Sequence, residues 1–361
     1  MGSYDFPSPP QESLDAPKPW IETPLIYSPS VSRRAGCNIY LKLENLQPSG
    51  SFKSRGIGNL MLSSLSPSRP PPHFLCSSGG NAGLACGTTS LSLSRPSTIV
   101  VPTATSPLMV SKLRALSPDG LVTVIQTGDS WFEADQYLRN ELLKGSDKVY
   151  VPPFDHPEIW EGCTSMIDEI VRQFPEGDGR GKTIDGIVAS VGGGGLVNGI
   201  CMGVEKNLKS FGGRRPKVLA IETVGADSLY QSVRQGERVE LGMISSIATS
   251  LGARRVSEKT WELANGGYGT KGKDFISATV TDRDAAIGCI KFLDDARFLV
   301  EVACGATVVT AYNGDLRKHL GGEDMSDEEW KTKNIILVVC GGSNVDLEML
   351  GKYKEVFDIP A

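Results

Sequence analysis

The sequence predicts an α/β fold with parallel sheets, and three features carry that prediction. Short runs rich in β-branched residues recur along the chain, and each one ends at glycine or proline. Segments with a helical spacing of apolar residues lie between these runs, and this alternation is typical of parallel sheets covered by helices. The chain has 361 residues, which is long enough for more than one core, so two domains are expected.

The predicted strands have the composition of strands that are buried on both faces of a sheet. They occupy residues 38–45, 73–80, 97–102, 121–128, 148–154, 185–195, 217–223 and 334–342. The predicted helices occupy residues 107–116, 131–143, 159–174 and 282–293. Thr281 is the expected N-cap of the last of these helices.

Two α/β units of unequal size are expected. A smaller domain at residues 48–145 is inserted into a larger domain formed by residues 1–47 and 146–361. Glycine-rich segments at 79–83, 192–195 and 341–342 directly follow predicted strands. Ligands of parallel sheets bind at the carboxyl ends of the strands, so these segments are the first candidates for a site.

Composition argues against several classes of protein. A formal net charge of −5 disfavours binding to nucleic acid or to an anionic membrane by bulk electrostatics. The eight cysteines include no CxxC pair and are interpreted as reduced thiols, and the three histidines do not suggest a metal centre. The first 20 residues lack a signal-peptide pattern, and no run approaches the roughly 20 apolar residues of a membrane span. We therefore expect a cytoplasmic protein with a small-molecule ligand.

Lys53 follows the predicted strand at 38–45 and stands beside Phe52 in the run Ser51-Phe52-Lys53-Ser54. A lysine next to an aromatic ring and small residues can be desolvated enough to lose its proton and form an imine. The alternative interpretation is an ordinary lysine that faces solvent.

The segment from Ser77 to Gly83 is a candidate anion cradle. Its hydroxyls and backbone N–H groups lie at an expected helix N-terminus, where a carboxylate is a natural ligand. Asn81 adds a neutral side chain that can hydrogen-bond an aromatic hydroxyl. The alternative is a helix-capping turn that needs glycine for a positive φ.

Four consecutive glycines, Gly192 to Gly195, follow another predicted strand and precede Leu196. Without side chains, their N–H groups can converge on one anion such as a phosphate. Neither the dinucleotide pattern GxGxxG nor the P-loop pattern is met, so a nucleotide is not required. The alternative is a tight structural turn.

Cys340 and Gly341 end the apolar run at 334–342. A thiol with an ordinary pKa of roughly 8.5 is neutral in the cell. Such a thiol can hydrogen-bond a ring nitrogen without forcing its protonation. The alternative is a buried structural cysteine.

Taken together, these segments resemble the fold-type II pyridoxal phosphate enzymes, and among them the L-serine/L-threonine dehydratases. The motifs that carry the resemblance are QPSGSFKSRGIGN at 47–59, CSSGGNAG at 76–83, SVGGGGL at 190–196, LVEVACGA at 299–306 and VVCGGSNV at 338–345. The resemblance implies two three-layer domains of the tryptophan synthase β-like type, pyridoxal 5'-phosphate as cofactor, and a homodimer.

The resemblance also implies a role for each candidate residue. Lys53 forms the aldimine with the cofactor and removes the substrate α-proton, Phe52 stacks on the ring, and Asn81 hydrogen-bonds the ring hydroxyl. The phosphate is held by Gly192, Gly193, Gly194, Gly195 and Leu196. The ring nitrogen is met by Cys340, and Gly341 beside it is a further cofactor-binding residue. The substrate carboxylate is received by Ser78, Gly79, Asn81 and Ala82.

The expected reaction eliminates the β-hydroxyl of L-serine or L-threonine and releases pyruvate or 2-oxobutanoate with ammonia. The alternatives are a β-replacement reaction and a non-catalytic module that binds a phosphate ligand. Lys53 argues against such a module, because a binder has no need of an imine-forming amine. Gly79 stands where the resembling racemases carry a serine as second acid/base, so we expect little formation of D-serine.

Glu222, Ala226 and Ser228 match positions that hold a monovalent cation in the resembling enzymes. A carboxylate, a carbonyl and a hydroxyl oxygen suit a hard cation such as K+. The alternative is that Glu222 is a capping or ion-paired carboxylate at a strand end.

Overall fold

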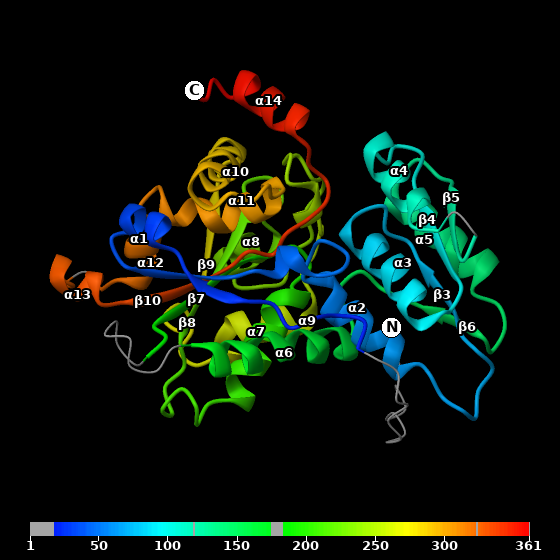
Figure 1. The fold of residues 1–361 in the computed structure, drawn as a ribbon, viewed down its shortest axis with the longest axis horizontal. Helices are drawn as coiled ribbons and strands as arrows, with labels where there is room; N and C mark the ends of the chain where they lie inside the picture. The colour runs from blue at the N-terminus through cyan, green and yellow to red at the C-terminus, as the bar shows by residue number, and fades with distance from the viewer. Residues whose placement is uncertain (1–17, 118–119, 175–182, 323, 361) are drawn as a thin grey trace.

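The protein is seen in a computed structural model that describes residues 18–117, 120–174, 183–322 and 324–360. Two sheets lie side by side, each with helices packed on it (Figure 1). The larger sheet has the strand order β1-β2-β10-β7-β8-β9, and the smaller has the order β5-β4-β3-β6. The α/β fold is therefore confirmed. Most of the N-terminal segment considered above, residues 1–17, lies outside the described residues.

Parallel pairing dominates both sheets, with one exception at an edge. The strands of the larger sheet are β1 (Leu25–Tyr27), β2 (Asn38–Lys42), β7 (Gly186–Ser190), β8 (Lys217–Thr223), β9 (Phe275–Val280) and β10 (Asn334–Val338). Those of the smaller sheet are β3 (His73–Cys76), β4 (Ser97–Val101), β5 (Val122–Gln126) and β6 (Lys148–Tyr150). Because β1 pairs antiparallel with β2, the larger sheet is mixed, which corrects the expectation of parallel sheets alone.

The helices include all four that the sequence predicts. They are α1 (Pro29–Ala35), α2 (Lys53–Ser63), α3 (Asn81–Leu93), α4 (Pro107–Ala115), α5 (Trp131–Tyr137), α6 (Pro157–Gln173), α7 (Gly195–Lys206), α8 (Ser228–Gln235), α9 (Glu258–Glu262), α10 (Asp282–Ala296), α11 (Val302–Val308), α12 (Asp315–Leu320), α13 (Asp327–Lys331) and α14 (Leu347–Val356). Thr281 caps α10 in a capping box with Asp284, as predicted. None of the helices in the described residues has the length and apolar character needed to span a membrane.

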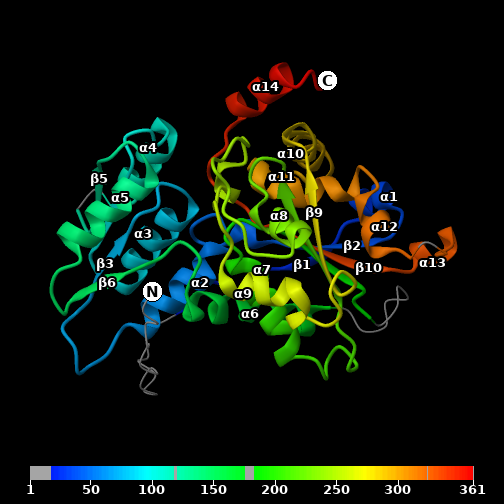
Figure 2. The same ribbon diagram turned by 180° about the vertical axis from the view of Figure 1, so that it is seen from behind.

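Each sheet is the middle layer of three. Helices α10 and α11 cover one face of the larger sheet, and α6 and α7 cover the other (Figures 1 and 2). In the smaller sheet, Phe74 and Ile99 pack toward the core formed with α2, α3 and α4. Leu75 and Val100 point the opposite way and pack on α5. The alternation follows from the period of two along a strand.

Helix α2 joins the two units, because it packs against both α3 and α6. Strand β6 pairs with β3, so the smaller sheet extends to Tyr150. The division of the chain at residues 48 and 146 stays a prediction.

Candidate active site

Lys53 is the first residue of α2 and is half-buried. Its Nζ donates to the carbonyl oxygen of Pro153 at 2.5 Å and lies 5.2 Å from the centre of the Phe52 ring. Burial lowers the pKa of Lys53 to about 8, although nearby thiols, Cys163 first, raise it in part. An amine with that pKa is a far better nucleophile and base at neutral pH than a solvated lysine.

The turn before Lys53 is fixed to the end of strand β10. Phe52 N donates to the carbonyl of Cys340 at 3.1 Å, and Gly342 N donates to the carbonyl of Gly50 at 2.9 Å. Gly341 has φ +83°, and a Cβ there would lie 2.3 Å from the Gly50 oxygen. Only glycine allows this close approach, which brings Lys53 and Cys340 to one place.

Helix α3 begins at Asn81, so the segment from Ser78 to Ala82 forms its N-terminal turn. Ser78 and Gly79 are half-buried, whereas Ala82 is buried. The Ser77 hydroxyl donates to Asp135 Oδ1 at 2.6 Å. The Ser77 hydroxyl therefore cannot donate to a ligand as well. The hydroxyl of Ser78 and the backbone N–H groups remain as donors for a carboxylate in this turn.

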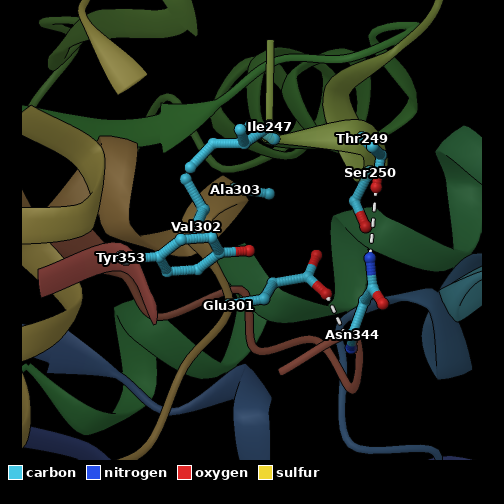
Figure 3. Close-up of a pocket in the computed structure, with 9 residues that line it drawn as sticks. Ile247, Thr249, Ser250, Glu301, Val302, Ala303, Asn344 and Tyr353 are labelled. Carbon is cyan, nitrogen blue, oxygen red and sulfur yellow. Dashed lines mark hydrogen bonds between the residues drawn. The ribbon is translucent and has the colours of Figure 1, made fainter. Parts of the chain in front are cut away.

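Asn81 links the smaller sheet to the loops of the larger one. Ser343 N donates to Asn81 Oδ1 at 2.9 Å, and Asn81 Nδ2 donates to Glu301 Oε1 at 2.9 Å. Glu301 lines a small pocket together with Ser250, Asn344 and others (Figure 3). The candidate ring-binding asparagine is therefore held by groups from two distant segments.

The tetraglycine segment forms the turn between β7 and α7. Gly194 has φ +100°, and a Cβ on Gly193 would lie 2.2 Å from the ring of Phe154. In the part of the chain that the structure describes, the N–H groups of Gly192 to Leu196 have no hydrogen-bond partner. Unpaired donors at a helix N-terminus form a cradle for an anion.

Cys340 is buried beyond the end of β10, and its Sγ lies 3.5 Å from Ser190 Oγ. A hydrogen bond with the thiol of Cys304 and then burial raise its pKa. The thiol is therefore neutral, as its expected place at a ring nitrogen requires.

These segments converge and fit pyridoxal phosphate. The carbonyl of Pro153 accepts from Lys53 and the ring of Phe154 lies against Gly193, so two neighbouring residues connect the amine to the anion cradle. Cys340 contacts both the Lys53 turn and Ser190. An amine, an aromatic ring, a neutral thiol and five unpaired N–H groups match the groups of that cofactor.

Glu222, Ala226 and Ser228 lie at the carboxyl end of β8 and are all buried. Both oxygens of Glu222 accept N–H groups of α8, from Leu229 at 2.9 Å and Tyr230 at 2.7 Å. Glu222 therefore caps α8, although burial raises its pKa. The buried Ser228 Oγ has no partner among the described residues, which leaves an oxygen free for a cation.

Sequence interpretation missed Glu301 and Thr105. Glu301 lies within the LVEVACGA motif, where a lone carboxylate in an apolar run was the available signal. Thr105 packs against Gly79 and offers no such signal, because it stands in an ordinary turn ahead of α4.

The chain is similar to known proteins along almost its full length. The family model of the pyridoxal-phosphate dependent enzymes matches residues 18–341. An L-serine dehydratase of Saccharomyces cerevisiae is 37% identical over 348 residues, which cover 94% of this chain and 98% of that protein. An L-serine dehydratase/L-threonine deaminase of Bos taurus is 37% identical over 93% of this chain and 95% of its own.

A solved structure agrees with these sequence matches. The fungal L-serine ammonia-lyase from Rhizomucor miehei has a TM-score of 0.81 and 31% identity, covering 94% of this chain and 99% of that one. With the site geometry described above, these similarities show that the chain belongs to the family of pyridoxal-phosphate dependent enzymes.

Proposed function

We propose that this protein is an L-serine/L-threonine ammonia-lyase that releases pyruvate or 2-oxobutanoate together with ammonia. The observation that carries the proposal is the amine of Lys53, half-buried with a pKa of about 8, next to an anion cradle of five unpaired N–H groups. The names of the relatives from yeast and cattle supply the substrate class.

Each residue has a task in this reaction. Bound pyridoxal phosphate supplies an electron-withdrawing ring that stabilises negative charge at the substrate α-carbon. Lys53 would hold the cofactor, and its Nζ would be the base that takes the substrate α-proton. Phe52 packs against the ring. The phosphate is held by Gly192, Gly193, Gly194, Gly195 and Leu196.

The other residues orient the two ligands. Asn81 Nδ2 would donate to the ring hydroxyl, and the neutral thiol of Cys340, beside Gly341, would face the ring nitrogen. The substrate carboxylate is received by Ser78, Gly79, Asn81 and Ala82. Glu222, Ala226 and Ser228 hold a monovalent cation, and support comes from the unpaired hydroxyl of Ser228.

We propose that the protein is located in the cytoplasm and forms a homodimer. All eight cysteines are free and buried, which suits a reducing compartment. The homodimer rests on the resemblance, and light scattering tests it against the chain mass of 38.7 kDa.

One experiment tests the function. Borohydride reduction of the cofactor-loaded protein, followed by peptide mapping, is expected to place the cofactor on Lys53. The same preparation is expected to form pyruvate from L-serine, and Lys53→Ala to lose at least about a thousandfold in rate, as for removal of a covalent catalyst. Label on a different lysine, or thioether formation from L-serine and a thiol in place of pyruvate, contradicts the proposal.

A further inference from the structure

Glu301 is a buried carboxylate to which the proposed mechanism gives no task. It is the N-cap residue of α11, the residue is 3% exposed, and its side chain accepts from Asn81. We propose that Glu301 is a positioning residue, which turns the N–H₂ end of the Asn81 amide toward the cofactor. The inference rests on the proposed function, because it takes Asn81 to face the cofactor.

The partners of Asn81 fix which end of its amide points where. The backbone N–H of Ser343 can only donate, so the atom it contacts at 2.9 Å has to be the amide oxygen. The amide nitrogen then faces Glu301 Oε1 at 2.9 Å. Its other proton points to Ser250 Oγ at 3.4 Å, which is a weak hydrogen bond. That weak bond is the one that a cofactor oxygen can replace.

Glu301 is itself held tightly by the loop after β10. Asn344 N donates to Glu301 Oε2 at 3.1 Å (Figure 3). Gly342 has φ +115°, and a Cβ there would lie 2.0 Å from Glu301 Cδ. The glycine is therefore required for the loop to close around the carboxylate.

Only a carboxylate satisfies both neighbours of Glu301. Asn81 Nδ2 and Asn344 N are both donors, and each contacts a different oxygen of Glu301. A glutamine has one acceptor and one donor, so it would place an N–H₂ group against one of them. Glu301→Gln keeps the shape of the side chain and weakens the hold on the N–H₂ end of the Asn81 amide, while Ser343 N still binds the amide oxygen.

The test measures the affinity of the cofactor-free protein for pyridoxal phosphate by absorbance titration. Glu301→Gln is expected to weaken that affinity about tenfold, as for loss of one hydrogen bond to a charged group. Asn81→Ala is expected to weaken it at least as much. The double variant is expected to be no weaker than Asn81→Ala alone, because Glu301 acts through Asn81.

Tyr353→Phe is the matched control. Tyr353 lines the same pocket and points its hydroxyl toward Glu301 (Figure 3), but that hydroxyl has no hydrogen bond in the described residues. Its removal is expected to leave the affinity unchanged. If Glu301→Gln is insoluble, Glu301→Asp replaces it, because the shorter side chain draws the carboxylate away from Asn81 with its charge intact.

Two outcomes separate failure of this inference from failure of the function. If Glu301→Gln weakens binding equally in the wild-type and the Asn81→Ala backgrounds, or not at all, Glu301 does not position Asn81. If Asn81→Ala itself binds the cofactor normally, the placement of Asn81 at the cofactor is wrong, whatever Glu301 does.

Discussion

At Gly79, the structure adds a steric reason to the chemical one for the absence of a side chain. A Cβ at this position would lie 2.7 Å from Thr105 Cγ2 and 2.9 Å from Thr105 Oγ1. Gly79 does not have a positive φ, so its backbone does not require glycine in the way a left-handed conformation would. Thr105 and a side chain at position 79 therefore compete for the same space.

We expect Gly79→Ser to lower kcat/KM for L-serine by about tenfold or more, because overpacking of this size costs about 1–3 kcal/mol. The added serine is not expected to produce D-serine in this variant, since Thr105 blocks its place. Thr105→Gly in the same chain is expected to restore much of the elimination rate. Pyruvate formation and chiral chromatography of the serine measure both effects.

Gly80→Ser is the control for this pair, because the nearest atom to a Cβ there is Ser78 Oγ at 3.9 Å. Its melting temperature is expected to stay near that of the wild type, whereas Gly79→Ser melts lower. If Gly79→Ser has the melting temperature and the elimination rate of the wild type, Thr105 moves aside without loss of stability or activity, and the expectation is wrong.

The candidate site residues that could be predicted from the sequence are those within local motifs. Lys53, Asn81 and Cys340 were found because glycine or small residues surround them at strand ends. Glu301, the hydrogen-bond partner of Asn81, was not predicted. It is 220 positions away along the chain, and only folding brings the two residues together. Whether these residues perform their expected roles stays a prediction.

On the scale of elements, helix α2 is anchored by buried charges two residues beyond Lys53. Arg55 is 1% exposed and binds Glu44 at 2.7 Å and Glu169 at 2.6 Å. Lys42 also binds Glu169, at 2.6 Å, so two cations match two carboxylates. This cluster connects α2 to the end of β2 and to α6, and it sets the direction in which α2 starts.

We expect Arg55→Met to lower the free energy of unfolding by about 3–5 kcal/mol, because it leaves buried carboxylates without their cation. Arg172→Met is the control, since Arg172 and Glu22 form an exposed ion pair, with side chains 58% and 53% exposed. Such a pair contributes at most about 1 kcal/mol. Urea denaturation followed by circular dichroism measures the free energy of unfolding of both variants. Equal decreases in the two would show that the cluster does not anchor α2.

Among the strands, the two that the sequence missed lie at the edges of the larger sheet. Strand β9 mixes buried and half-buried residues, and β1 has only three residues and no buried one. Neither has the fully buried pattern of β7 and β10, which were predicted. Edge strands face neighbours on one side alone, so their sequences carry a weaker signal.

On the scale of the whole molecule, the candidate site is assembled from both sheets. Lys112 of α4 donates to the carbonyl oxygen of Ser343, and Asn81 of α3 accepts its N–H. Helices α3 and α4 of the smaller unit therefore bind both the backbone N–H and the backbone carbonyl of one residue of the larger unit, Ser343. A ligand bound between the two units is therefore expected to contact residues of both.

Pyridoxal phosphate is accordingly expected to stabilise both units of the protein and not the larger one alone. A ligand that binds only the folded state adds about 2.7 kcal/mol at a hundredfold excess over its dissociation constant. Hydrogen exchange with and without the cofactor is expected to show added protection in β4 of the smaller sheet as well as in β8. Lys53→Ala is the control: it keeps the glycine cradle, so it should retain weaker protection in β8 while losing most of that in β4. Protection confined to the larger sheet in the wild type would mean that the two units do not bind the cofactor together.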